Sequence, residues 1–407
     1  MSPRTPAGTN RDAPVRQSSL RAHNLALVLR QVSAIAATGR PVSRADVAAA
    51  TGLTRATVST LVDELVRGQL VAEIGPAPRT GAGRPATGLV LAGTGPAGLG
   101  LEINVDYLAA CVLDLAGTVR HRATEWTDQR NREPAEVVAS LAQLARSATG
   151  AAADQGLEAV GVAVAVPGLV QDGVVRLAPN LGWRGVPLAA LLAPALGGPR
   201  PTVDNEANLA ALGEAAPGES FVYVSGEVGI GAGIVLGGEL FRGTHGWAGE
   251  LGHVAIHPDG PLCHCGSRGC LEQYAGQEAI LATAGASLPR GVQGTVTDAV
   301  ARASAGEPGM LAALDAAGTA LGVAVAGVVN LLDVGTVVLG GSYALLAPWL
   351  AGPVERELTA RVLTAGWSPV TVRASRLGTE ATVVGAAGSV VRALREDPAT
   401  WLAGRTS

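Results

Sequence analysis

The amino-acid sequence predicts an α/β protein in which a small helical module precedes two α/β lobes around a cleft. Two observations carry this prediction. Residues 18–92 show three helical patterns followed by two short strand patterns, whereas the chain from residue 98 onward alternates apolar strands with helices. The expected domains are a disordered arm over 1–17, the helical module over 18–92, a first lobe over 98–204 and a second lobe over 205–407, whose C-terminal helix is expected to pack back on the first lobe.

The N-terminal module has the pattern of a helix-turn-helix. A first helix is expected within residues 21–39. A second follows Ser43, whose side chain is expected to cap it together with Asp46 in a capping-box variant. Gly52 breaks this helix, and Thr54 caps a third. Two helices joined by a glycine-containing turn are typical of DNA-binding helix-turn-helix proteins.

Two strand patterns after the third helix predict a wing. They cover residues 70–74 and 87–91, and a Gly/Pro/Arg loop over 75–85 joins them. We expect the third helix to enter the major groove and the wing to reach phosphates or the minor groove. The side chains expected to contact DNA are Arg44, Thr54, Arg55, Thr57, Ser59, Thr60, Arg79 and Arg84. The alternative is an ordinary three-helix packing module.

Charge is unevenly distributed along the chain. The net charge is -4, and because the sequence contains no lysine, all 30 basic residues are Arg. Residues 1–91 carry a formal charge of +6 and the remainder carries -10. A basic module on an acidic body is the asymmetry expected when one end of a protein meets nucleic acid.

Composition and cysteine usage argue against secreted and membrane classes. Four cysteines, three of them clustered, do not make a secreted disulfide framework, so a reducing cytoplasm is expected. The N-terminus lacks the apolar segment of a signal peptide. The most apolar window, 316–329, is too short to span a bilayer. We therefore expect a cytoplasmic protein with no membrane role.

Strand and helix patterns alternate from Gly98 onward. The expected strands cover 100–104, 108–115, 159–166, 221–225, 230–236 and 336–339. The expected helices cover 134–149, 275–285, 295–305, 309–332 and 381–395, and one more begins at Glu206. Mixed strands and helices over this length predict two α/β lobes.

Three of the four cysteines fall within eight residues, ten positions after a histidine. The four residues are His253, Cys263, Cys265 and Cys270. Three thiolates and one imidazole make a closed tetrahedral ligand set that suits structural Zn²⁺. The alternative, free core cysteines in a Gly-rich loop, is disfavoured because such clustering rarely arises without metal or disulfide chemistry.

Two carboxylates flank the predicted metal loop. Glu250 stands three residues before the histidine, and Glu272 stands two residues after the last cysteine. Carboxylates and a metal-fixed imidazole are good partners for the hydroxyl groups of a sugar. For Glu272 the alternative is a carboxylate at a helix N-terminus, and both roles are compatible.

The chain resembles the ROK family, named for repressors, open reading frames and sugar kinases. The resemblance covers nearly all of residues 20–395 and rests on the motifs GELGH at 249–253, CHCGSRGCLE at 263–272, DNEANLAALGE at 204–214 and APNLGW at 178–183. It implies the two-lobed fold of actin, Hsp70 and hexokinase, an ATPase-type, ribonuclease H-like architecture. The winged module places the chain with the repressor branch, of the xylose-repressor type.

The resemblance also implies site residues. The family's zinc would be held by His253, Cys263, Cys265 and Cys270. The sugar site would be formed by Gly168, Asn205, Glu206, Glu250, His253 and Glu272. His253 would then serve both sites, with one ring nitrogen on the metal and the other facing the sugar.

Two positions depart from the pattern of the family's kinases. The phosphate-cradling Asp-x-Gly-x-Thr loop is replaced by residues 102–106, EINVD, which lack the glycine and the hydroxyl. The catalytic base, an Asp in the family, is replaced by Glu206. Its extra methylene displaces the carboxylate by about 1 Å, an error that can cost roughly a hundredfold in rate. Glu227 in the second Gly-rich loop is electrostatically unfavourable for phosphate. We expect no catalysis.

The sequence thus predicts a sugar-responsive DNA-binding regulator, a repressor of carbohydrate-utilisation genes. A homodimer or homotetramer would place two recognition helices on a palindromic operator, and sugar bound between the lobes would change their spacing. The first alternative is a glucokinase-like, ATP-dependent sugar kinase with a DNA-binding domain, using Glu206 as base. The second is a structural zinc protein that binds neither operator nor sugar.

Overall fold

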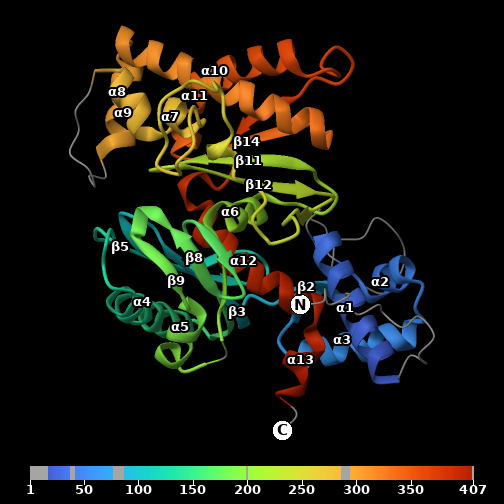
Figure 1. Cartoon of the computed structure of the whole chain (residues 1–407). Coiled ribbons are helices and arrows are strands. Elements are labelled where there is room, and N and C mark those ends of the chain that lie inside the picture. The colour runs from blue at the N-terminus through green and yellow to red at the C-terminus, as the bar shows by residue number, and fades with distance from the viewer. Residues whose placement is uncertain (1–16, 37–41, 77–86, 199, 286–293, 406–407) are drawn as a thin grey trace, which may run out of the picture. The chain divides into compact units, whose positions relative to one another are not determined.

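The computed structural model describes residues 17–36, 42–76, 87–198, 200–285 and 294–405 (Figure 1). The chain divides into two compact units, which are described separately. Unit 1 comprises Met1–Gly95 together with Arg392–Ser407, and unit 2 comprises Pro96–Val391. The predicted arm, apart from its last residue, and the two wing arginines, Arg79 and Arg84, lie outside the described residues.

Unit 1 contains the predicted helix-turn-helix and wing. Its elements are α1 (Gln17–Ala36), α2 (Arg44–Thr51), α3 (Arg55–Arg67), β1 (Val71–Pro76), β2 (Thr87–Leu91) and α13 (Pro398–Ala403). Ser43 and Asp46 form the predicted capping box at the start of α2, and Gly52 ends this helix with a left-handed φ of 72°. Thr54 caps α3. Strands β1 and β2 pair antiparallel.

The C-terminal helix α13 packs on the helix-turn-helix module. The indole Nε1 of Trp401 donates a hydrogen bond of 2.8 Å to the carbonyl oxygen of Gly68, the residue that follows α3. A Cβ at Gly68 would collide with the side chain of Leu402, so this glycine permits the close approach. The guanidinium carbon of Arg405 lies 4.5 Å from the centre of the Trp401 ring, a cation–π contact.

The first lobe of unit 2 is built on a five-stranded sheet with strand order β10–β6–β3–β4–β5. Its strands are β3 (Gly95–Ile103), β4 (Tyr107–Asp114), β5 (Val119–Trp126), β6 (Leu157–Val166) and β10 (Thr202–Asn205). A smaller antiparallel sheet contains β7 (Leu169–Gln171), β8 (Val174–Ala178) and β9 (Trp183–Val186). The helices are α4 (Pro134–Ala153), α5 (Leu188–Leu196) and the 3-10 turn η1 (Pro179–Leu181). Apolar residues of β3, β4 and α4 form the core of this lobe.

The second lobe has its own five-stranded sheet, with strand order β13–β12–β11–β14–β15. Its strands are β11 (Phe221–Gly226), β12 (Ile230–Leu236), β13 (Glu239–Leu240), β14 (Thr336–Gly341) and β15 (Thr371–Ala374). Strands β11, β14 and β15 run parallel. The remaining helices are α6 (Glu206–Glu214), η2 (Leu251–His253), α7 (Glu272–Ala275), α8 (Gln277–Thr283), α9 (Gly294–Ser304), α10 (Pro308–Leu332), α11 (Ser342–Arg361), η3 (Gly378–Glu380) and α12 (Ala381–Glu396). The residues of α12 from Arg392 onward belong to unit 1.

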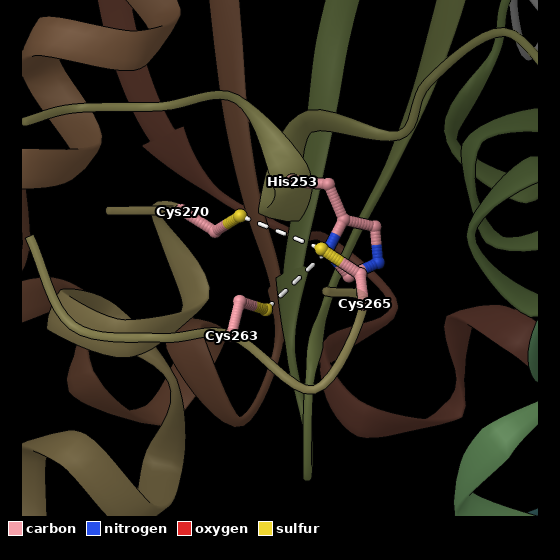
Figure 2. Close-up of side chains that lie close together, drawn as sticks. All are labelled: His253, Cys263, Cys265 and Cys270. Atoms are coloured by element: carbon pink, nitrogen blue, oxygen red, sulfur yellow. Dashed lines mark hydrogen bonds between the residues drawn. The ribbon is translucent and has the colours of Figure 1, made fainter. Parts of the chain in front are cut away.

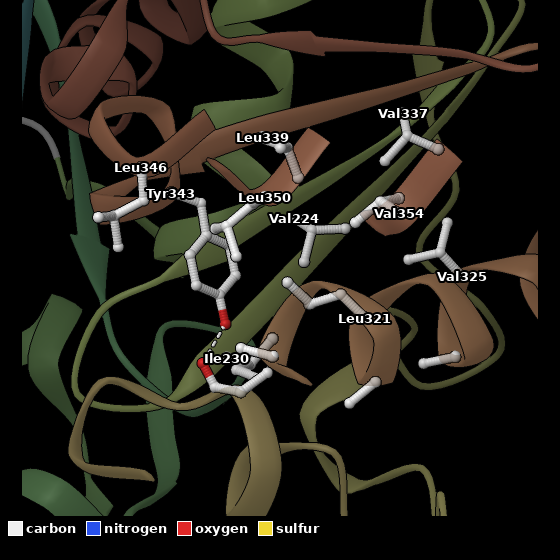
Figure 3. Packing of buried hydrophobic residues seen from close by; sticks show 14 of the residues in the cluster. Val224, Ile230, Leu321, Val325, Val337, Leu339, Tyr343, Leu346, Leu350 and Val354 are labelled. Carbon is white, nitrogen blue, oxygen red and sulfur yellow. Dashed lines mark hydrogen bonds between the residues drawn. The ribbon is translucent and has the colours of Figure 1, made fainter. Parts of the chain in front are cut away.

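Helices α10 and α11 pack against the second sheet and supply most of its apolar core (Figure 3). The buried hydroxyl of Tyr343 donates a 2.7 Å hydrogen bond to the carbonyl of Ala275, so α11 is also tied to α7. By length and composition α10 could cross a membrane, but most of its apolar stretch is buried in this core. Its buried residues include Leu321 and Val325.

Two helical regions of this lobe differ from what the sequence predicts. The helix expected over 275–285 is two short helices, α7 and α8, separated at Gly276. Helix α11 is not predicted at all, because Pro348 and Pro353 lie inside it and proline disfavours helix interiors. Packing overrides this preference: a Cβ on Gly318 of α10 would lie 2.7 Å from the Pro353 side chain, so the two helices lie in close contact there.

Helix α12 lies in direct backbone contact with β3 and α6. A Cβ at Gly98 or Gly100 of β3 would collide with backbone carbonyls of α12. A Cβ at Gly385 of α12 would collide with the carbonyl oxygen of Leu209 in α6. Helix α6 begins directly after Asn205, so glycine contacts connect the end of strand β10 to the C-terminal helix of unit 2.

We predict that Gly385→Ala destabilises unit 2 by about 1–3 kcal/mol, because the new methyl group has no space at the α6–α12 contact. The control is Gly388→Ala on the same helix, whose Cβ would meet only the Leu113 side chain at 3.8 Å. This change should be neutral or stabilise by up to about 1 kcal/mol, because alanine favours helix. Urea unfolding of both variants measures the difference, and equal stabilities would contradict the prediction.

Candidate functional site

The predicted metal ligands converge (Figure 2). The ligand atoms of His253, Cys263, Cys265 and Cys270 all lie within 4.8 Å of one another. The Sγ atoms of Cys265 and Cys270 are 3.6 Å apart, and Cys263 Sγ lies 3.9 Å from His253 Nδ1. Tetrahedral zinc–sulfur bonds of about 2.3 Å separate neighbouring ligand atoms by about 3.8 Å. The four residues therefore fit one tetrahedral metal ion.

The loop that carries these ligands has little regular secondary structure. His253 ends the turn η2, and Cys270 forms an isolated β-bridge with Ala255. Gly269 adopts a left-handed φ of 67°, and a Cβ there would collide with the backbone of His257. Backbone hydrogen bonds join its two ends, from Ile256 N–H to the Gly269 carbonyl and from Leu271 N–H to the Val254 carbonyl. A metal ion shared by the four ligands would add a constraint on their side chains.

The two ring nitrogens of His253 face different partners. Nδ1 faces the cysteine cluster, whereas Nε2 lies 4.0 Å from Glu250 Oε2. Burial raises the pKa of the Glu250 carboxyl and Glu272 raises it further, although His253 lowers it. Glu272 Oε2 accepts a hydrogen bond from the backbone N–H of Ile230 at 3.3 Å, which fixes this carboxylate beside strand β12.

Other predicted sugar ligands gather at the carboxyl end of β10. The amide nitrogen of Asn205 donates to the carbonyl of Gly168 at 2.9 Å, and its Oδ1 accepts the N–H of Ala207 at 2.8 Å, which caps α6. Glu206 is the first residue of that helix. The contacts therefore hold Gly168, Asn205 and Glu206 together as one group, while Glu250, His253 and Glu272 form another.

Sequence reasoning missed two residues, Asn180 and Trp247, that lie where the first and second lobes of unit 2 meet, near the two groups of predicted sugar ligands. Trp247 Nε1 donates a hydrogen bond of 3.3 Å to the carbonyl of Val170 in β7. A Cβ at Gly229 would lie 3.8 Å from Asn180 Nδ2 and would collide with the Glu272 carboxylate. Asn180 belongs to the APNLGW motif, and Trp247 lies two residues before the GELGH motif, so the motifs carried a signal for both.

A group of buried glutamates lies in the segments that the sequence predicts to replace the kinase phosphate loops. Glu102 is 2% exposed and accepts a 2.8 Å hydrogen bond from the hydroxyl of Tyr107. Burial, together with the charges of Glu206 and Glu227, raises the pKa of Glu102 to about 8. Burial raises the pKa of Glu206 to about 7, and burial plus the charge of Glu206 raises that of Glu227 to about 8. Near neutral pH Glu102 and Glu227 are therefore mostly protonated, whereas Glu206 is protonated in only part of the molecules.

The predicted DNA-contacting residue Arg44 is engaged within unit 1. Its Nη2 lies 2.6 Å from Asp63 and 2.7 Å from Glu73, and its Nη1 donates to the carbonyl of Ser59 at 3.3 Å. The two carboxylates raise the pKa of Arg44 against the opposing effect of burial. These contacts tie α2, α3 and β1 together, so Arg44 holds α3 in place within unit 1.

The other predicted DNA contacts lie along α3. Thr54 accepts the backbone N–H of Thr57 at 3.2 Å, so both threonines take part in the helix cap. Arg55 and Thr60 are exposed, and Ser59 is half-buried. The opposite face, formed by Val58, Leu61, Val62 and Leu65, is buried. Helix α3 therefore presents a polar face that begins with Arg55.

Comparisons with known proteins agree with this architecture. A model described as ROK family matches residues 98–392, and one described as IclR helix-turn-helix domain matches residues 29–74. The chain belongs to the ROK family. The resemblance found in its motifs is thus confirmed.

Both regulators and kinases of this family are similar to the chain. The xylose repressor of Bacillus subtilis (strain 168) is 29% identical over 363 residues, covering 86% of this chain and 91% of that protein. The structure of a ROK family transcriptional regulator, homolog of the E. coli MLC protein, matches with a TM-score of 0.76 and 27% identity over 94% of this chain and 99% of that one. The structure of a ROK family glucokinase from Streptomyces griseus, in complex with glucose and AMPPNP, matches with a TM-score of 0.61 and 28% identity over 72% of this chain and 98% of that one. The predicted fold class, a helix-turn-helix followed by a sugar-kinase-like α/β domain, is confirmed.

The buried glutamates predict a specific pH dependence of stability. For Glu102 the pKa rises from 4.5 in the unfolded chain to about 8 in the fold. The folded protein therefore keeps this proton more tightly than the unfolded chain does. The resulting contribution to the free energy of unfolding is complete below pH 4.5 and is lost as the pH rises towards 8. Over that range the free energy of unfolding should fall by about 1.4 kcal/mol per pH unit for each additional proton that the fold holds. Urea unfolding between pH 5 and about pH 9 measures this slope. Glu102→Gln keeps an acceptor for Tyr107 and should lower the slope by the share of one proton, because Glu206 and Glu227 still titrate. An unchanged slope would contradict the assignment.

Proposed function

We propose that this chain is a sugar-responsive transcriptional repressor, in which unit 1 binds operator DNA and unit 2 binds the sugar. The observation that carries the proposal is the combination, in one chain, of a winged helix-turn-helix with a kinase-like domain whose carboxylates flank a His/Cys₃ cluster. The similarity to a xylose repressor over 86% of the chain supports it. Genes for carbohydrate utilisation are the expected targets.

The sugar would lie against the two groups of polar residues in unit 2. Asn205, Glu250 and Glu272 would bind hydroxyl groups, with Gly168 lining the site and Glu206 beside it. His253 would direct Nε2 towards the sugar and Nδ1 towards the metal, as its contacts with Glu250 and the cysteines support. A zinc ion would fix the loop between these residues, and it would take no part in chemistry at the sugar.

The chain would not act as a sugar kinase. The region of the first phosphate loop holds Glu102, which is buried and bound by Tyr107. The base position holds Glu206 where the family's kinases have Asp, and its extra methylene displaces the carboxylate by about 1 Å. A general base must lie within hydrogen-bond reach of the attacking hydroxyl, and such a displacement can cost roughly a hundredfold in rate. Both features support a regulator and argue against the kinase alternative.

Regulation would require the sugar to bind one arrangement of the protein better than another. Couplings between two ligand sites are typically about 1–3 kcal/mol, which corresponds to roughly 5- to 150-fold in operator affinity. A homodimer or homotetramer would present two α3 helices to a palindromic operator. The sugar would then act by changing how these helices are spaced.

Removing a metal ligand should abolish the sugar response. We predict that Cys265→Ser, or treatment with a chelator, lowers the zinc content and removes the sugar-induced increase in melting temperature, because the loop with Glu250 and His253 loses its shape. Elemental analysis and thermal-shift assays with a panel of pentoses and hexoses measure both effects. Cys111→Ala, at the buried cysteine outside the cluster, is the control and should keep both. A metal-free Cys265→Ser protein with an intact sugar response would refute this role.

Operator binding should depend on the exposed start of α3. We predict that Arg55→Ala weakens binding to a fragment from upstream of the chain's own coding region by about 1–3 kcal/mol, the usual effect of losing one base-contacting arginine. Arg184→Ala removes the same charge from an exposed position of β9 and is the control. Fluorescence anisotropy at several salt concentrations measures both, and wild-type affinity should fall steeply with salt. Equal affinities of the two variants would count against α3 as the recognition helix.

A further inference from the structure

Two loops of unit 2 meet where α/β proteins commonly bind anions. Strands β11 and β14 are parallel neighbours, and Gly226 at the end of β11 pairs with Gly341 at the end of β14. The chain then enters a glycine-rich turn after β11 and the helix α11 after β14. Ligands of α/β sheets bind outside the carboxyl ends of such strands, and helix N-termini bind phosphate. The elements of a phosphate site are therefore present.

The side chain of Glu227 fills this position. Its carboxyl accepts a hydrogen bond from the backbone N–H of Ser342, the first residue of α11. Its Oε1 lies so close to Gly341 that a Cβ on this glycine would be only 2.5 Å away. Gly341, the residue before α11, provides no side-chain cap. Glu227 thus supplies the oxygen at the positive end of a 20-residue helix, where a bound phosphate would otherwise supply it.

The surroundings of Glu227 would also disfavour a phosphate. The titratable groups that interact with it are Glu102, Asp106, Tyr107, Glu206, Tyr223 and Tyr343, all acidic or neutral. Phosphoryl transfer needs positive charges and metal ions at this place. Glu227 holds a proton near neutral pH, so it excludes a phosphate there by the volume of its side chain and by its hydrogen bond to the Ser342 N–H. When the carboxyl ionises at higher pH, its negative charge also repels the phosphate.

We propose that the Glu227 side chain takes the place of a nucleotide phosphate at the N-terminus of α11 and thereby prevents unit 2 from binding ATP. The amino-acid residues that would bind the sugar stay accessible. The inference rests on the proposed function as a regulator. It adds a cause for the loss of kinase activity that is independent of the base position Glu206. In this respect the chain would differ from its glucokinase relative, whose structure contains AMPPNP.

Calorimetric titration of the full-length, zinc-loaded protein with magnesium–AMPPNP tests this inference. Glu227→Ala removes the carboxyl and should bind at least about tenfold more tightly than wild type. Glu227→Gln keeps the size and the acceptor, so it should bind as weakly as wild type. Glu355→Ala, at an exposed position of the same helix, is the charge-matched control and should also resemble wild type.

Three results would overturn the inference: wild type binding as tightly as Glu227→Ala, Glu227→Ala gaining no more than Glu355→Ala, or Glu227→Gln gaining as much as Glu227→Ala. Glu227→Ser is the second variant if the alanine protein does not fold. The sugar-induced melting shift is recorded for each protein. Its absence in wild type would count against the proposed function, whereas the nucleotide titration alone decides the role of Glu227.

Discussion

In the function that we propose, the position of one loop governs what unit 2 binds. The segment from Glu250 to Glu272 has almost no regular secondary structure, yet it carries two carboxylates and an imidazole that must hold fixed positions to recognise a ligand. Turn hydrogen bonds and the Ala255–Cys270 bridge hold its backbone. The four converging ligand atoms would add a constraint on the side chains, because one metal ion bound by His253 and three cysteines would join both ends of the loop.

Both kinases and a regulator are similar to this chain in structure, and in our proposal the difference lies in a few side chains. Unit 2 has parallel strands that end beside the N-terminus of α11, and the buried glutamates Glu102 and Glu227 lie in this region. Carboxyl groups that retain protons tolerate burial better than ionised ones, which explains how Glu102, Glu206 and Glu227 can share this space. In our proposal the binding of sugar is retained and the transfer of phosphate is lost.

The sequence predicted the parts of this protein that depend on local signals. The capping residues Ser43 and Thr54 marked α2 and α3, and cysteine spacing marked the metal cluster. Features set by distant contacts were not predictable. Helix α11 contains two prolines and forms because it packs on α10, and Arg44 is held by acids 19 and 29 residues away. Helix propensity depends on the local sequence, so it cannot predict such distant contacts.

The most direct measurement of the central claim is a titration of the operator complex with sugar, before and after removal of the metal. Fluorescence anisotropy of a labelled operator fragment reports how much protein is bound. The account predicts that sugar releases the metal-loaded protein from DNA and leaves the metal-free protein bound at the same concentrations. Release of both forms by the same sugar concentrations would contradict it.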